Sequence, residues 1–164
     1  MWGIVGEQDN IVEDGIELDD EFLGEFHHSV DAKGRLVLPS DHRSLIGKET
    51  IHMTLGFDNI MTIHPPADWV KIRASVGEMR RGDRSQRRTA RALFSNASKQ
   101  TLDKQGRITI PPNLREKCGL TKEVVVVGMG EFIEVWPQDR WESEQGEAND
   151  LYVNTDETTG MGSL

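Results

Sequence analysis

The chain has 164 residues, a net charge of −9 and a single cysteine. This length suits one ordinary domain or two small ones. One cysteine excludes an internal disulfide and fits a reducing compartment such as the cytosol. No apolar run approaches the roughly 20 residues that a membrane-spanning helix needs, and the acidic start lacks the features of a signal peptide. We therefore expect a cytoplasmic protein without a membrane partner.

The acidic charge lies at the two ends of the chain. Residues 1–21 carry eight acidic groups and no basic ones, and residues 138–164 carry seven acidic groups and one arginine. The part between these ends has a net charge of +5. Acidic segments with few apolar residues bury too little surface to fold. We expect disordered extensions over 1–21 and 142–164, flanking a basic body that can attract polyanions.

The first copy of an internal repeat, residues 22–69, is predicted to contain short strands and one short helix. Asp31-Ala32-Lys33-Gly34 has Asp at its first position and Gly at its fourth, as a type I turn prefers, so we expect a β-hairpin there. Pro39 and Ser40 introduce a helix that Gly47 ends. The expected strands are Glu25–Val30, Arg35–Leu38, Ile51–Leu55 and Ile60–Ile63, and the expected helix is Asp41–Ile46.

Two helices, Asp68–Met79 and Asp83–Leu93, are predicted to follow, with a break at Arg81-Gly82. We assign residues 70–93 as a basic helical linker. Its basic residues either add phosphate contacts that make DNA binding sensitive to salt, or form a solvated helix face that pairs with the acidic ends. The sequence leaves both interpretations open for Lys71, Arg73, Arg80, Arg81, Arg84, Arg87, Arg88 and Arg91.

The second copy, residues 94–141, repeats the plan of the first at a constant offset of 72 residues. Ten positions are identical between the copies, where roughly three would match by chance at ordinary composition. A unit this small buries too little surface to be stable alone, so we expect the copies to form one body around a pseudo-twofold axis. The expected strands are Ser98–Leu102, Arg107–Ile110, Val124–Val127 and Phe132–Trp136, with a helix at Asn113–Cys118.

The paired turns are the strongest candidate for a binding site. Each copy places a lysine in the turn and an arginine directly after its glycine. Tight turns favour the Asp and the Gly, but they do not require the arginine. The planar fork of arginine can reach phosphate oxygens or the O6/N7 edge of guanine. We expect Arg35, Arg107, Lys33 and Lys104 to contact DNA with Arg43 and Arg115 as supports, while Asp31, Gly34, Asp103 and Gly106 shape the turns.

No pattern in the sequence indicates catalysis. Paired aspartates occur in aspartic proteases, but cations beside these turn aspartates would keep both carboxylates ionised. His27 and His28 are adjacent in a predicted strand and therefore point to opposite faces. Cys118 is expected to be packed rather than reactive, and no Cys or His has the spacing of a metal site. We expect no enzyme activity, cofactor, metal or small-molecule substrate.

The chain resembles the MraZ family of bacterial regulators, which are tandem members of the AbrB/MazE-like swapped-hairpin group. The resemblance spans about residues 22–141. It rests on Phe22-Leu23-Gly24, on both Asp–x–x–Gly–Arg turns with the prolines that follow them, and on the segments 120–128 and 134–141. The Asp–x–x–x–Arg signature of the family falls on Asp31/Arg35 and Asp103/Arg107.

The resemblance implies a mainly β fold, a double-psi-like β-barrel in which two AbrB-like swapped-hairpin half-domains interlock, assembled as a ring-shaped homo-oligomer. It also implies binding of double-stranded DNA at short direct repeats upstream of the division and cell-wall gene cluster, on the nucleoid. A ring that presents one face several times would gain avidity on such repeats. The alternative is an antitoxin-like or scaffold module whose acidic ends hold a basic partner. Salt-sensitive, sequence-selective DNA binding would separate the two hypotheses.

Overall fold

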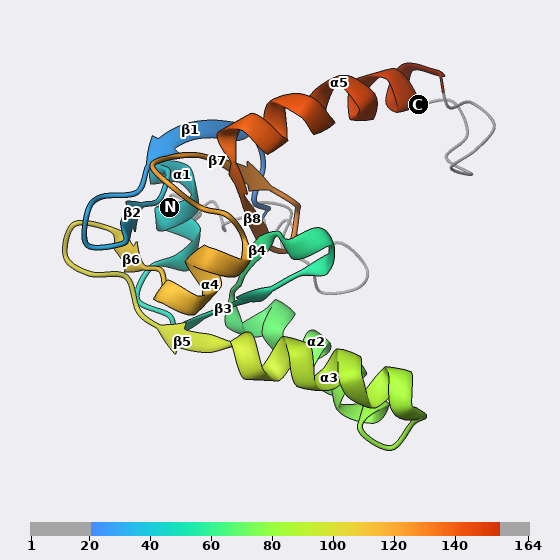
Figure 1. The fold of residues 1–164 in the computed structure, drawn as a ribbon. Helices are drawn as coiled ribbons and strands as arrows, with labels where there is room; N and C mark the ends of the chain where they lie inside the picture. Colours follow the sequence, from blue (N-terminus) through green and yellow to red (C-terminus); the bar gives the residue numbers. More distant parts are fainter. Residues whose placement is uncertain (1–20, 155–164) are drawn as a thin grey trace, which may run out of the picture.

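The structure, a computed structural model, describes residues 21–154 (Figure 1). Residues 1–20 and 155–164, for which we expected disordered extensions, lie outside the described residues. An antiparallel sheet has the strand order β1-β7-β8-β4-β3-β5, and β2 and β6 form a separate two-stranded ribbon. The strands are β1 (Glu25–Ser29), β2 (Arg35–Val37), β3 (Ile51–Leu55), β4 (Met61–His64), β5 (Ser98–Gln100), β6 (Arg107–Thr109), β7 (Glu123–Gly128) and β8 (Ile133–Pro137).

Strands of one copy pair with strands of the other. β1 pairs with β7 and β5 pairs with β3, and the offset of 72 residues relates these two pairings to each other. In the ribbon Leu36 lies opposite Ile108, and between β4 and β8 Thr62 lies opposite Glu134. The two residues of each pair are 72 positions apart and therefore equivalent in the two copies. The pseudo-twofold axis that relates the copies thus passes between Leu36 and Ile108 and between Thr62 and Glu134. The expected interlocking of two repeats is confirmed.

The turns form as predicted, but the strands beside them are not paired as in a simple hairpin. In the first turn the Asp31 N–H donates to the Arg35 carbonyl at 2.9 Å, and the Gly34 N–H donates to the Asp31 carbonyl at 3.0 Å. Beyond this turn only an isolated bridge between Val30 and Leu36 joins the two segments. The expected β-hairpin is therefore limited to the turn and this bridge, because β2 takes its other partner strand, β6, from the other copy.

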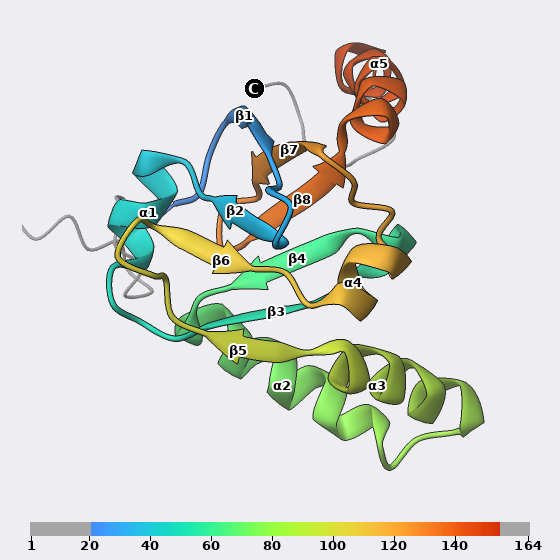
Figure 2. The same ribbon diagram turned by 60° about the vertical axis from the view of Figure 1, so that its left-hand side comes forward.

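The ribbon lies across the six-stranded sheet and closes one hydrophobic core (Figure 2). Leu36 and Ile108 of the ribbon are fully buried in the same cluster as Met53 of β3 and Val126 of β7. Val124–Val127 is buried along its whole length, as its unbroken apolar sequence predicted. The short helices α1 (Ser40–Ile46) and α4 (Pro112–Lys117) follow the two ribbon strands.

Two longer helical elements project from this body in different directions (Figure 1). The first is a hairpin of α2 (Pro66–Met79) and α3 (Arg84–Asn96), which breaks where the sequence predicted. The second is α5 (Gln138–Asn154). None of the helices within residues 21–154 combines the length and the apolar character needed to cross a bilayer.

Helix α5 corrects the expectation of disorder from residue 142 onward, because it continues to Asn154. Its first turns are anchored to the barrel. The ring of Trp141 packs edge-on against Trp136 at 5.4 Å between centroids, and its Nε1 donates to a carboxylate oxygen of Glu25. Gln145 donates to the same carboxylate at 3.3 Å. Tertiary contacts of this kind stabilise a helix that composition alone does not predict.

Candidate nucleic-acid interface

Each turn is locked by its aspartate. Oδ1 of Asp31 accepts hydrogen bonds from the backbone N–H groups of Lys33 and Arg35, both at 2.9 Å, and Oδ2 accepts from Nε of Arg35 at 2.7 Å. In the second turn, Asp103 accepts from the backbone N–H of Arg107 at 2.9 Å and from its Nε at 2.7 Å. The aspartate thus fixes the backbone of the turn and the base of the guanidinium together.

The same hydrogen bonds keep both aspartates ionised. The backbone N–H of Arg35 is the main cause that lowers the pKa of Asp31 below its ordinary value of 3.8, and its side chain adds to the effect. Arg107 lowers the pKa of Asp103 in the same way. Because Asp31 is bound by Nε of Arg35, the two terminal nitrogens of this guanidinium have no hydrogen-bond partner within residues 21–154. Those nitrogens can still bind a ligand.

The arginines expected to act as supports pack against the turn of the opposite copy. A Cβ atom added to Gly106 would lie 2.2 Å from Cδ of Arg43, and one added to Gly34 would lie 2.7 Å from Nη1 of Arg115. Both glycines have positive φ angles, +73° and +80°. Only glycine combines this backbone conformation with such close approach of another side chain. Each turn therefore lies directly beneath an arginine of the other repeat.

Backbone hydrogen bonds cross between the repeats at the same place. The carbonyl of Gly34 accepts from the N–H of Ile110 at 2.8 Å, and the carbonyl of Gly106 accepts from the N–H of Leu38 at 3.2 Å. The two turns are thus fixed relative to each other by main-chain contacts as well as by the two arginines. The arrangement presents two Asp–Arg units at a constant separation.

The two lysines expected at the interface are exposed, but they do not occupy equivalent positions. The offset of 72 residues aligns Lys33 with Gln105, and it aligns Lys104 with Ala32. Our sequence reasoning did not include Gln105, whose side-chain oxygen accepts from Nη2 of Arg107 at 3.4 Å. Alignment of the two copies residue by residue would have identified it.

The arginine cluster of the α2–α3 hairpin is not part of this surface. Figure 1 shows the two turns at one end of the molecule and the tip of the hairpin at the opposite end. A short DNA segment on the turns would therefore leave this cluster free. The structure separates two basic regions that the sequence could not distinguish.

The other chemically reactive groups do not form a site of their own. Cys118 is buried, and burial raises the pKa of its thiol to about 11, so it is not a nucleophile at neutral pH. Among residues 21–154 there is no group of three His, Cys, Asp or Glu side chains that could hold a metal ion. The paired turns remain the surface with the most distinctive chemistry.

Two repeats that exchange strands across a pseudo-twofold axis, each with an Asp–x–x–Gly–Arg turn, define a tandem swapped-hairpin protein. A family model described as "MraZ protein, putative antitoxin-like" matches this chain twice, over residues 22–92 and 93–162. The chain belongs to the MraZ family.

Relatives with the name "Transcriptional regulator MraZ" align with most of the chain. The protein of Acetivibrio thermocellus is 41% identical over 128 residues, which cover 78% of this chain and 89% of the relative. That of Dictyoglomus thermophilum is 41% identical over 130 residues, 79% of this chain and 88% of the relative. That of Lactobacillus delbrueckii subsp. bulgaricus is 38% identical over 131 residues, which cover 80% of this chain and 91% of the relative.

Proposed function

We propose that this protein is a sequence-specific DNA-binding transcriptional regulator that contacts DNA through its paired turns. The observation that carries the proposal is the crossed arrangement of the turns, in which each is covered by an arginine of the opposite repeat. A pair of rigid cationic tips at fixed separation suits a ligand with regularly spaced phosphates. The name of the relatives, transcriptional regulator, agrees with this function.

In this proposal Arg35 and Arg107 are the principal contacts. Their Nε atoms are held by Asp31 and Asp103, so the terminal nitrogens are oriented in advance for a phosphate or for the O6/N7 edge of guanine. The lysines Lys33 and Lys104 contact phosphates, while Arg43 and Arg115 hold the turns in place. Preorganised side chains lose less conformational entropy on binding and therefore bind more tightly.

The expected targets are direct repeats upstream of the division and cell-wall gene cluster, bound at the nucleoid in the cytoplasm. The protein would act as a ring-shaped homo-oligomer. Each subunit then offers one pair of turns, and neighbouring subunits contact successive repeats of the DNA. Such multivalent binding gives high overall affinity even where a single pair of turns binds weakly.

The test compares binding of the full chain to its own upstream DNA and to scrambled DNA of the same length. Replacing Arg35 and Arg107 together by Ala is expected to reduce selective affinity by roughly tenfold or more, because each specific arginine contact contributes about 1–3 kcal/mol. The matched control replaces two exposed arginines of the distant hairpin, Arg84 and Arg88, by Ala. Circular dichroism and the oligomer mass check that each variant stays folded and assembled.

Two results would contradict the proposal. One is equal binding by the turn variant and wild type. The other is wild-type protein that is fully assembled and shows no preference for its own upstream DNA.

A further test measures how the affinity for DNA depends on salt concentration. Loss of one phosphate contact, as in Lys33→Ala, is expected to lower the slope of log K against log salt concentration by about 1.

An antitoxin-like interaction module is a second candidate, because the family description and helix α5 both favour it. The end of α5 exposes Leu151, Tyr152 and Val153, whose exposed fractions are 67%, 65% and 79%. An acidic helix with exposed apolar side chains suits a basic partner protein with an apolar groove. Absence of selective DNA binding by assembled wild-type protein would favour this function over the first.

A further inference from the structure

A cavity of about 440 Å³ lies between helix α2 and the part of the sheet formed by β3, β4 and β8. Its lining comes from both copies of the repeat, because β3 and β4 belong to the first copy, while β8 and the loop before it belong to the second. The turn arginines Arg35 and Arg107 do not line it. Cavities of this size commonly bind small organic molecules.

Much of the wall that α2 provides is apolar. Ile72, Val76 and Met79 follow one another at helical spacing and line the cavity. The rings of Phe132 and Trp136 add to this apolar surface from the second copy. Aliphatic and aromatic side chains bury the apolar body of a ligand, and the faces of aromatic rings also attract cations.

A row of polar side chains crosses the sheet at the same cavity. Thr54 of β3 lies opposite Thr62 of β4, and Thr62 in turn lies opposite Glu134 of β8. All three residues line the cavity. Residues directly opposite each other on antiparallel strands have Cβ atoms about 4.5–5.5 Å apart. The hydroxyl of Thr62 and the carboxylate of Glu134 can therefore bind the same small group.

The hydroxyl oxygen of Thr62 is able to accept a hydrogen bond from a ligand. Burial lowers the pKa of His64 below its ordinary value of 6.5, so its ring is neutral at neutral pH. Nδ1 of His64 lies 2.5 Å from Oδ2 of Asp68, and a carboxylate only accepts, so Nδ1 carries the proton of the ring. Nε2 must then accept, and it lies 2.8 Å from Oγ1 of Thr62. The hydroxyl donates to this nitrogen, which leaves its oxygen as an acceptor.

The negative charge that lines the cavity is only partly neutralised. The lining includes no lysine or arginine of residues 21–154, but it includes the carboxylates of Asp58, Asp68, Glu131 and Glu134. Glu131 pairs with Lys71 at 2.7 Å. Asp58 and Glu134 make no ion pair with any described residue, and Glu134 accepts only from the indole N–H of Trp136, at 2.8 Å. The cavity therefore favours an occupant with positive charge.

The guanidinium of Arg140 lies close to this cavity without neutralising it. It is 5.4 Å from the ring centroid of Trp136 and donates to the backbone carbonyl of Asp58, not to a carboxylate. Because this positive charge is held beside Asp58, the charge of a cationic ligand is expected to lie nearer to Glu134.

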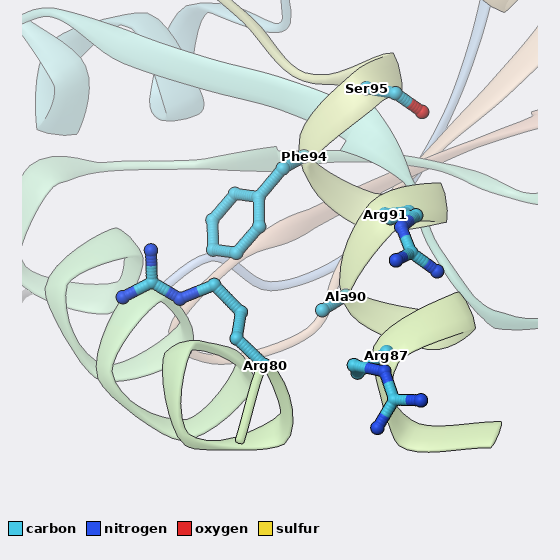
Figure 3. Close-up of a pocket in the computed structure, with 6 residues that line it drawn as sticks. All are labelled: Arg80, Arg87, Ala90, Arg91, Phe94 and Ser95. Atoms are coloured by element: carbon cyan, nitrogen blue, oxygen red, sulfur yellow. The ribbon is translucent and has the colours of Figure 1, made fainter. Parts of the chain in front are cut away.

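A second hollow, on the α2–α3 hairpin, has the opposite charge. It has a volume of about 680 Å³, and the described residues that line it include three arginines and no acidic side chain. Figure 3 shows Arg80 and Phe94 pointing toward each other across it, whereas Arg87 and Arg91 point away from Phe94 on the other side of α3. An anion is attracted to this hollow and a cation is repelled. The charge of a ligand thus distinguishes the two places.

We infer that the cavity beside α2 binds a small organic cation, with its ammonium group between Thr62 and Glu134 and its apolar body against α2. An ammonium group has only donors, and both residues offer acceptors. A hydrogen bond between an ammonium and a carboxylate is stronger than one between neutral groups. The inference goes beyond the proposed function and uses neither the turns nor DNA, so a failure of the DNA-binding proposal leaves it unaffected.

The first experiment titrates the full chain with matched pairs of probes by calorimetry in the absence of DNA. Phenethylamine and tryptamine are protonated at neutral pH, and phenethyl alcohol and tryptophol are their neutral analogues. At least one amine is expected to bind about tenfold more tightly than its alcohol, because a charge-assisted hydrogen bond is roughly twice as strong as a neutral one. Phenylacetate, an anion of similar size, is expected to bind more weakly than either amine.

The second experiment removes the charge of the cavity without removing its hydrogen bond to the indole of Trp136. Glu134→Gln keeps a side-chain oxygen of the same reach, so it should weaken binding of the amine about tenfold and leave binding of the alcohol unchanged. Glu116→Gln is the matched control, since this exposed carboxylate of α4 does not line the cavity. It should change neither affinity. Circular dichroism of each variant checks that its fold is unchanged.

The third experiment fills the entrance of the cavity. Ser75 is an exposed residue of α2 that lines it, so Ser75→Trp should weaken binding of the amine and of the alcohol alike by roughly tenfold or more. Ala74→Trp places the same side chain on the neighbouring exposed residue, which does not line the cavity. This control should bind both probes as the wild type does.

Several outcomes would overturn the inference. These are amines that bind no more tightly than their alcohols, a Glu134→Gln variant that keeps the full affinity for the amine, or a Ser75→Trp variant that binds both probes as the wild type does. Preferential binding of phenylacetate that is lost in Arg80→Ala would assign ligand binding to the hollow of the α2–α3 hairpin instead.

Discussion

The two repeats agree closely at their turns and differ where their last strand meets a helix. Positions 64 and 68 of the first repeat correspond to positions 136 and 140 of the second. In the first, Nδ1 of His64 lies 2.5 Å from Oδ2 of Asp68, and both side chains are buried. In the second, the guanidinium of Arg140 lies 5.4 Å from the ring centroid of Trp136. The same corner is built from two unrelated contacts.

The difference follows from which contacts cross between the repeats. Each turn packs against an arginine of the opposite copy and accepts a backbone hydrogen bond from that copy, so a change in one turn alters both. The strand–helix corners also touch the opposite repeat, but through contacts that differ in kind. The ring of His64 stacks on Phe132 at 5.2 Å between centroids, whereas the guanidinium of Arg140 donates to the carbonyl of Asp58. The His64–Asp68 and Trp136–Arg140 contacts themselves lie within one repeat, so each corner has its own chemistry, while the Asp, Gly and Arg of the two turns are the same.

The corners should therefore differ in their effect on stability. Asp68→Ala leaves Nδ1 of the buried His64 ring without a partner, although Nε2 keeps the hydroxyl of Thr62, and this is expected to cost about 2–4 kcal/mol in the free energy of unfolding. The equivalent change in the second repeat, Arg140→Ala, removes a partly exposed cation–π contact and an exposed hydrogen bond to the carbonyl of Asp58, and it should cost about 1 kcal/mol. Urea unfolding of both variants, followed by circular dichroism, measures the difference.

Asp68→Asn is the control, because it keeps a hydrogen-bonding side chain of the same size while removing the charge. It should be less destabilising than Asp68→Ala. Equal losses for Asp68→Ala and Arg140→Ala would mean that the two corners are equivalent in energy despite their different chemistry.

At the turns, adding a single methyl group to a glycine should lower the free energy of unfolding by a smaller amount than Asp68→Ala does. In Gly106→Ala the new residue must adopt a positive φ angle, which costs about 1–2 kcal/mol, and its Cβ atom must displace the side chain of Arg43. Gly130→Ala is the matched control, since this glycine also has a positive φ angle, +77°, but no atom lies within 4 Å of an added Cβ. The extra loss of stability at Gly106 isolates the contact between the repeats. No difference between the two variants would contradict the interlocking of the turns.

Much of the turn architecture could be predicted from the sequence. The constant offset of the two copies revealed the duplication, and the positions of Asp31 and Gly34 indicated the turn type. These predictions succeed because turn geometry depends on neighbouring residues. The contact of Arg43 with Gly106 could not be predicted in this way, since it joins residues of different repeats through the fold. The pairing of β2 with β6 was missed for the same reason, as a local turn pattern does not identify the partner strand.

Helix α5 shows a second limit of sequence reasoning. Its acidic composition and Gly146 indicated disorder, yet Trp141 and Gln145 bind Glu25 of β1 and hold its first turns against the barrel. The exposure of the Phe57 side chain, which is 85%, could not be predicted from the sequence either, because large apolar residues are more often buried than exposed. Both features depend on tertiary packing rather than on periodicity.

The smallest expected difference between the two regions is in their response to pH. Burial lowers the pKa of His64 below its ordinary value of 6.5, against the opposing effect of Asp68. The unfolded chain then binds a proton more readily than the folded one, so the contribution of His64 to stability is complete above pH 6.5 and declines as the pH falls below it. The turn aspartates have lowered pKa values, so their contribution is present above pH 3.8 and is lost only at lower pH.

Between pH 7.5 and 5.5 the protein should therefore lose stability through its buried histidines while the turns stay locked. Burial also lowers the pKa values of His28 and His52, so His64→Gln should reduce the slope of unfolding free energy against pH without abolishing it. Urea unfolding at several pH values measures this slope. A gain in stability as the pH falls would show that His64 takes up a proton to form an ion pair with Asp68. The corner would then resemble the turns, in which a carboxylate and a cation are held together.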